Sequence, residues 1–134
     1  MAGRPTTYTQ ELADEVCERV ARGETLRAIE ELPHMPAKTT IWRWRHENEA
    51  FRTQYAHARE ASAYAFENRA LDYCDRLEQA SSITEVQGLK EAAQILKWAA
   101  GVRAPKSHGD LTKLEHTGGG GAPLSVVINR PEAE

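Results

Sequence analysis

The chain has 134 residues, which is enough for about one domain or for a small domain with an assembly element. It has 17 lysines and arginines and 20 aspartates and glutamates, and the net charge of -3 argues against nonspecific binding of DNA over the whole surface. Cys17 and Cys74 have no CxxC spacing, and the sequence shows neither a signal peptide nor a long apolar run. Secretion and membrane spanning are therefore not expected, and the cysteines are expected to be reduced thiols.

The first eight residues are expected to form an extended arm. Arg4 lies between Gly3 and Pro5, and an arginine arm of this kind can enter a minor groove of DNA. The alternative is a disordered terminus. Thr9 then predicts the N-cap of a helix that ends near Gly23. Thr25 predicts the cap of a second short helix, so the arm leads into a small helical core.

Residues 33–46 predict the turn and second helix of a helix-turn-helix. Met35-Pro36 ends the preceding helix, because proline disfavours the α conformation in the residue before it. Ile41 and Trp44 then form one apolar stripe with Ala37, and the opposite side can offer cations, a hydroxyl and an indole to phosphates and base edges. The alternative is a short basic surface helix. The candidate DNA-binding residues are Arg4, Lys38, Thr39, Trp42, Arg43, Arg45 and His46.

A long helical hairpin is expected next. Asn48 predicts an N-cap, and no glycine or proline follows until about Ala80, a span far above the mean helix length of about 11–12 residues. Ser82 with Glu85 and Thr84 with Gln87 both fit the spacing of a capping box, and a returning helix is predicted from Thr84 to about Ala100. This second helix carries two apolar seams, although a hairpin needs only one. The surplus seam is expected to face a neighbouring subunit, the alternative being the helix-turn-helix of the same chain. Its residues are Ala92, Ile95, Ala99 and Val102.

The C-terminal part is expected to be a linker and a tail. Gly101–Asp110 contains Pro105 and Gly109, and residues 117–123 are rich in glycine. The β-branched run Leu124–Asn129 predicts one strand. A lone strand leaves backbone groups unpaired, so the segment is either a disordered tail or a strand that pairs with other subunits. Its expected interface residues are Leu124, Val126, Val127 and Ile128.

No catalytic centre is expected in this chain. The glycine run at 118–121 is not followed by Lys and Ser/Thr, so it is not a phosphate-binding loop. The five histidines are scattered without metal-ligand spacing. Asp72 and Asp75 lie three residues apart on a helix, where a solvated acidic face is far more common than a nuclease site. We therefore expect no enzymatic activity, no metal and no cofactor.

Several stretches of the sequence carry a resemblance to a known family. They are residues 3–9, the helix of residues 12–23, residues 35–44, residues 48–60, and Lys97-Trp98 followed by residues 104–110. In these stretches the sequence resembles phage terminase small subunits of the Sf6-like helix-turn-helix family. The resemblance covers roughly residues 3–110, and His108 stands where family members commonly have an aromatic residue.

The resemblance implies that the protein recognises the viral genome at its packaging start and delivers it to the large terminase subunit, which carries the ATPase and nuclease. It also implies a ring with a helical hub, outer DNA-binding domains and a central barrel of C-terminal strands. Many DNA-binding units on one ring would gain affinity by avidity. The expected partners are double-stranded viral DNA, the large subunit and further copies, with the portal as another candidate, in the host cytoplasm.

The expected fold class is therefore mainly α with a single C-terminal β-strand joining an intersubunit barrel. The expected divisions are a helix-turn-helix domain at 1–47, a helical hairpin at 48–103, and a linker and tail at 104–134. The alternative functions are a dimeric helix-turn-helix transcriptional regulator and a structural adaptor that contacts protein rather than DNA. Salt-dependent DNA affinity would separate the adaptor from the other two.

Overall fold

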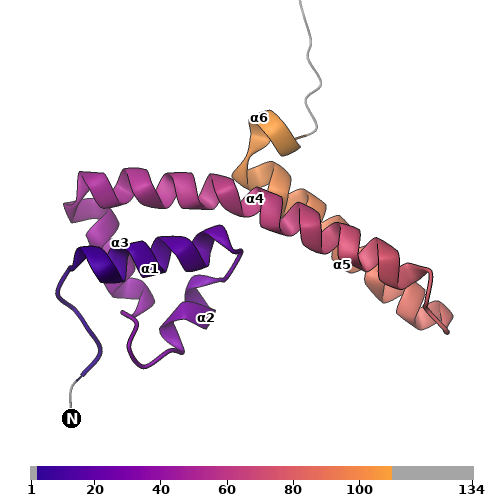
Figure 1. Ribbon diagram of the computed structural model, residues 1–134, viewed down its shortest axis with the longest axis horizontal. Coiled ribbons are helices and arrows are strands. Elements are labelled where there is room, and N and C mark those ends of the chain that lie inside the picture. The colour runs from indigo at the N-terminus through magenta and orange to yellow at the C-terminus, as the bar shows by residue number, and fades with distance from the viewer. Residues whose placement is uncertain (1–2, 110–134) are drawn as a thin grey trace, which may run out of the picture.

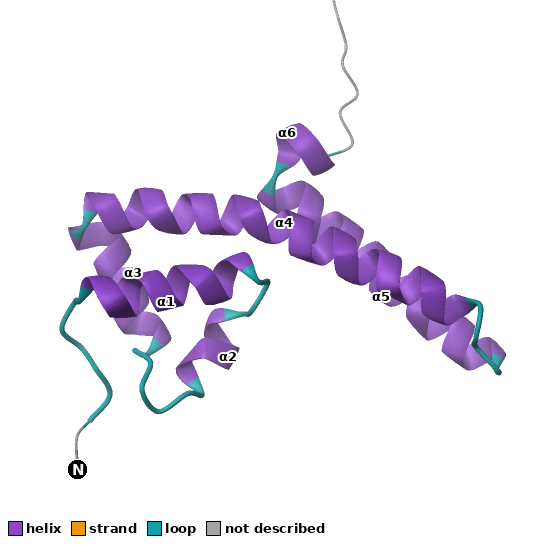
Figure 2. Ribbon diagram, in the orientation of Figure 1, coloured by secondary structure: helices purple, strands orange, loops and turns teal. Residues whose placement is uncertain are grey.

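The computed structural model describes residues 3–109, which fold into helices joined by short connections (Figure 2). The longest helix, α4, is the axis of the molecule: α1 and α3 pack against its first half, α2 packs on α1 and α3, and α5 returns along its second half (Figure 1). The elements are α1 (Gln10–Ala21), α2 (Leu26–Glu30), α3 (Lys38–Glu47), α4 (Glu49–Leu77), α5 (Ile83–Arg103) and α6 (Pro105–His108).

The first core joins α1, α2 and α3 to the beginning of α4. The predicted caps are present, since the hydroxyls of Thr9 and Thr25 accept from backbone N–H groups in the first turns of α1 and α2. Phe51 and Tyr55 of α4 complete the core, so the long helix contributes to both halves of the molecule. The buried apolar residues are Ala13, Val16, Cys17, Val20, Ile29, Met35, Ile41, Trp44, Phe51, Tyr55 and Ala58.

The second core lies between α4 and α5, as the predicted hairpin requires. Asn48 caps α4 as expected, and of the two candidate caps for α5 the structure has Ser82 rather than Thr84. Ala63 and Phe66 of α4 pack with Leu96, Ala100 and Ala104. The end of α5 is fastened to α4 by Arg103, which donates from Nη1 to Ser62 Oγ at 2.8 Å and lies 4.8 Å above the Phe66 ring. Burial, followed by repulsion from Arg59, lowers the pKa of Arg103.

The segment Gly101–Asp110 was expected to be a linker, and this expectation is wrong for the described residues. Helix α5 continues through Gly101 to Arg103, and Pro105 begins α6 because its fixed φ suits the first helical turn. His108 Nε2 lies 3.0 Å from Glu67 Oε2, which holds α6 against α4. A Cβ on Gly101 would lie 3.1 Å from the His108 carbonyl oxygen, so glycine permits this close approach.

The expected fold class is corrected in one respect. Residues 3–109 form a helical fold that contains no strand, so the expectation of a C-terminal strand joining an intersubunit barrel is wrong for this structure. A strand needs a second strand to pair its backbone groups, and every regular element of the described chain is a helix. The tail residues behind that expectation lie outside the described residues. They are Leu124, Val126, Val127 and Ile128.

Candidate nucleic-acid interface

Helix α3 presents one side to the core and the other to solvent. Ile41 and Trp44 are buried, as the apolar stripe predicted. Thr40 is also buried, which the stripe did not predict. The N-cap residue Ala37 has no side-chain acceptor, and Glu30 of α2 takes that role, because its Oε2 accepts from the Lys38 N–H at 2.9 Å. The start of α3 is thereby tied to the preceding helix.

The outer side of α3 brings together most of the predicted DNA-binding residues. Lys38, Thr39 and Trp42 line a shallow hollow at the beginning of the helix. The Trp42 side chain is 52% exposed although it is large and apolar, and no intramolecular core covers it. Arg43 and His46 continue the same exposed side toward the end of the helix. We call these five residues the α3 face.

The N-terminal arm lies beside the α3 face. Arg43 Nη2 donates to the Thr6 carbonyl at 2.9 Å, and Trp44 Nε1 donates to the same oxygen at 3.4 Å. The Tyr8 ring packs edge-on to Trp44 at 5.2 Å, and burial, then the charge of Asp14, raises the pKa of the Tyr8 hydroxyl. The arm is therefore held in place up to Thr6, with Arg4 exposed near its start.

Arg45, which was expected to make a DNA contact on the flank of α3, lies between Trp42 on the exposed side of the helix and Tyr55 of α4. It is half-buried, with its guanidinium carbon 4.6 Å from the Tyr55 ring centroid and 5.5 Å from the Trp42 ring centroid. Its Nε is buried without a hydrogen-bond partner among the described residues. Sequence reasoning missed Tyr55 as the platform, because Tyr55 lies on the next helix and no local spacing links it to Arg45.

Charge is distributed unevenly over the N-terminal half. The α3 face carries Lys38 and Arg43, and the Arg43 Nε lies 3.9 Å from Glu47 Oε2. Helix α1 instead carries a group of carboxylates on its outer side, with two arginines near the end of the helix. That group is Glu11, Asp14, Glu15 and Glu18, with Arg19 and Arg22. A local cationic face thus coexists with the net charge of -3.

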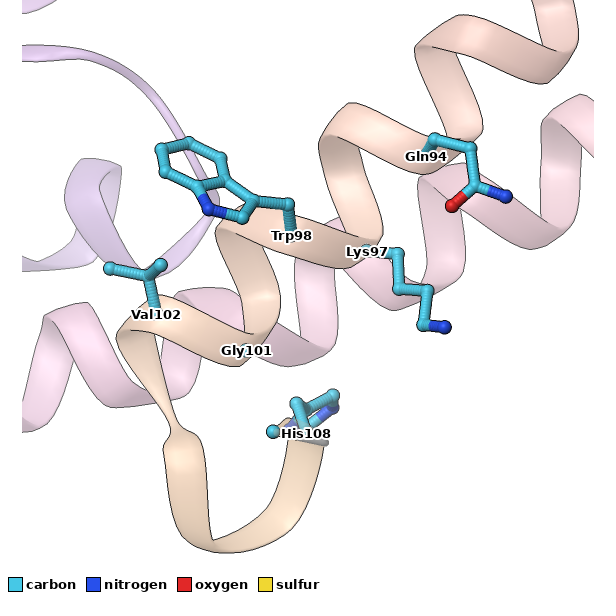
Figure 3. A pocket seen from close by; sticks show the side chains of 7 residues that line it. Gln94, Lys97, Trp98, Gly101, Val102 and His108 are labelled. Carbon is cyan, nitrogen blue, oxygen red and sulfur yellow. The ribbon is translucent and has the colours of Figure 1, made fainter. Parts of the chain in front are cut away.

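The predicted oligomer seam on α5 is exposed in part. Ile95 is 61% exposed and Val102 is 55% exposed, whereas Ala92 and Ala99 are half-buried. Sequence reasoning omitted Trp98 from the seam, yet its side chain is 69% exposed. Its position three residues after Ile95 and four before Val102 was the available signal. Figure 3 shows Trp98 and Val102 extending from one side of α5, away from Lys97, and all three residues line an open pocket together with His108 of α6.

Neither a metal site nor a membrane-spanning helix is found in the described chain. Across residues 3–109, no group of three or more His, Cys, Asp or Glu side chains could hold a metal ion. No helix in that range has the length and apolar character needed to cross a membrane.

Residues 8–115 match a family model described as bacteriophage Sf6, terminase small subunit-like. The structure is similar to crystal structures of variants of the terminase small subunit gp1 of the bacterial virus Sf6. One has 30% identity and a TM-score of 0.72, with 93% of this chain and 100% of that chain covered. Another has 28% identity and a TM-score of 0.71, with 96% and 98% covered. The sequence has no significant match among curated proteins.

Proposed function

The chain belongs to the Sf6 terminase small subunit-like family of phage DNA packaging, and on that premise we propose that it recognises viral double-stranded DNA through the α3 face. The observation that carries the proposal is the division of α3 into a buried side with Ile41 and Trp44 and an exposed side with Lys38, Trp42 and Arg43. A helix held in this way can enter a major groove with its cations near the phosphates.

The arm supplies a second element of the proposed interface. Because Arg43 and Trp44 both bind the Thr6 carbonyl, the arm leaves the α3 face in a defined direction. Arg4 can then enter the minor groove beside the major-groove helix, as arginine arms do. In this proposal Thr39 and Trp42 contact base edges, while Lys38, Arg43 and His46 contact phosphates or guanine.

We also propose that the working form is a homo-oligomeric ring. Exposed Ile95, Trp98 and Val102 on α5 leave apolar surface without cover in one subunit, and contact with a neighbouring copy would remove it from water. The proposed interface also includes Ala92 and Ala99. A ring presents many α3 faces together, so weak local patches gain affinity by avidity.

In this proposal the small subunit itself performs no chemistry. It binds the packaging site and passes the DNA to the large terminase subunit, with the portal as a further candidate partner. Residues 1–47 serve DNA binding and residues 48–103 serve assembly, with the first half of α4 shared between the two.

The test removes the two cations of the α3 face. A K38A/R43A variant of the full chain should lose most of its affinity for packaging-site DNA. The slope of log K, where K is the association constant for DNA, against the logarithm of the salt concentration should become shallower by about 0.9 for each phosphate that is no longer neutralised. Binding is measured by fluorescence anisotropy over a range of salt concentrations. The matched control is R69A/K90A, which removes the same charge from exposed positions of the hairpin.

Light scattering should show the same assembly state for both variants, because neither changes the α5 seam. If K38A/R43A binds packaging-site DNA as tightly as the wild type and with the same salt dependence, the α3 face is not the DNA interface.

A further inference from the structure

We propose that Arg45 is a positioning residue for Trp42 rather than a ligand of DNA: it is clamped between Tyr55 and Trp42 and holds the indole as a fixed wall of the hollow at the start of α3. The inference rests on the proposed function, because it takes the α3 face to be the surface that meets DNA. It assigns Arg45 a role different from the flanking contact expected from its charge.

The clamp joins a buried ring to an exposed one. Tyr55 is 3% exposed and belongs to the first core, so its ring is a rigid platform on α4. The Arg45 guanidinium carbon lies 4.6 Å from the centroid of that ring and 5.5 Å from the centroid of Trp42. A planar guanidinium stacks on aromatic faces and is attracted by their quadrupoles. Arg45 therefore transmits the rigidity of the α4 core to the outer side of α3.

The hydrogen-bonding state of Arg45 agrees with this role. Its Nε is buried and has no acceptor among the described residues, so this donor is directed away from any phosphate that approaches from solvent. Its backbone is also held, because the Arg45 carbonyl accepts from Arg52 Nε at 2.8 Å.

The indole is confined on more than one side. The ring of His46, one turn further along α3, lies 6.1 Å from the Trp42 ring, and Lys38 and Thr39 border the hollow on the side of the helix start. Trp42 is thus ordered before DNA arrives although it is half exposed. An ordered side chain loses less conformational entropy on binding, and this is how Arg45 would strengthen DNA binding without touching DNA.

A double-mutant cycle in the full chain tests the proposal. R45M keeps a long side chain but removes the charge and the planar group, and it should weaken binding of packaging-site DNA about twofold to fivefold, the range expected for an exposed cation–π contact. W42A should weaken binding at least as much. The R45M/W42A double variant should bind like W42A, because Arg45 then has no indole to hold.

The salt dependence separates positioning from phosphate binding. R45M should leave the slope of log K against log salt unchanged, whereas the matched control K38M should reduce it by about 0.9 if Lys38 neutralises one phosphate. The proposal is overturned if R45M reduces the slope as K38M does. It is also overturned if the double variant is weaker than W42A by the full R45M factor.

A measurement without DNA keeps this inference separate from the proposed function. The protein is labelled with 5-fluorotryptophan, and W42F assigns the Trp42 fluorine signal. In R45M that signal should move toward the shift of a solvent-exposed tryptophan, while the signal of buried Trp44 stays in place. An unchanged Trp42 signal would refute the clamp. If the wild type instead shows no salt-dependent DNA binding, the proposed function fails, and the fluorine spectrum still decides whether Arg45 holds Trp42.

Discussion

Trp42 and Trp44 lie two positions apart on α3 and have opposite environments. Trp44 is 2% exposed and packs edge-on to Phe51 at 5.9 Å, so it is part of the core. Trp42 projects from the other side of the helix and lines the hollow with Lys38 and Thr39. An apolar hollow beside a threonine hydroxyl suits the 5-methyl group of thymine, which projects into the major groove.

Replacing thymine with uracil in the bound DNA should therefore weaken binding. The exchange removes only the methyl group, and at about 0.8 kcal/mol for a buried carbon the affinity should fall about threefold to fourfold for each thymine that touches the hollow. Anisotropy titrations with singly substituted duplexes measure the effect position by position. The W42A variant should bind the thymine and uracil duplexes equally, and a W42A response equal to that of the wild type would place the methyl contact elsewhere.

At the scale of the element, a glycine allows the end of α1 to approach α4 closely. Gly23 follows α1 with a φ of 90°, in the left-handed region that glycine adopts without strain. A Cβ at this position would lie 2.9 Å from a ring carbon of Phe66. Phe66 belongs to the second core, so Gly23 is the point where the end of α1 touches the hairpin.

The substitution G23A should destabilise the protein through both effects. The left-handed backbone alone costs about 1–2 kcal/mol for a residue with a Cβ, which corresponds to a fall in Tm of several degrees for a domain of this size. Thermal unfolding followed by circular dichroism measures the change. The matched control is G88A on α5, where a Cβ would meet nothing within 4 Å and alanine favours the helix. Equal Tm values for G23A and the wild type would contradict this account.

Local signals predicted the elements well, and contacts between elements were less predictable. Thr9 and Asn48 mark helix starts through their side-chain acceptors, and α1 and α4 begin directly after them. For α5 the sequence offered both Ser82 and Thr84, and the structure has Ser82 as the cap. The clamp of Arg45 was not predictable, because Tyr55 approaches it only when α3 packs on α4. Helix α6 was missed because Pro105 and Gly109 resemble linker residues, although they begin and end this short helix.

At the scale of the whole molecule, the two proposed surfaces lie on different helices. The α3 face belongs to the N-terminal half, and the exposed seam with Ile95, Trp98 and Val102 belongs to α5 (Figure 1). DNA binding and assembly should therefore be separable by mutation. Loss of assembly should still weaken DNA binding indirectly, because avidity depends on the number of linked sites.

The triple substitution I95S/W98S/V102S should dissociate the assembly while the chain stays helical. Each of the three side chains is more than half exposed and contributes little to the core of a single subunit. The stability of the single subunit against unfolding should therefore change little. Light scattering measures the assembly, and circular dichroism measures the helix content. The matched control L71S removes another exposed apolar residue, on α4. A triple variant of unchanged mass would show that this seam is not the interface.

Helix α4 spans 29 residues without a glycine or proline. Phe51, Tyr55 and Ala58 belong to one core, and Ala63 and Phe66 belong to the other. The first core and the α4–α5 hairpin thus share one continuous helix, and neither can change its orientation relative to the other unless α4 bends. In a closed ring, the packing of the α4–α5 hairpins alone would set the spacing and tilt of successive helix-turn-helix domains. A long duplex that engages several of them would have to curve to fit the protein.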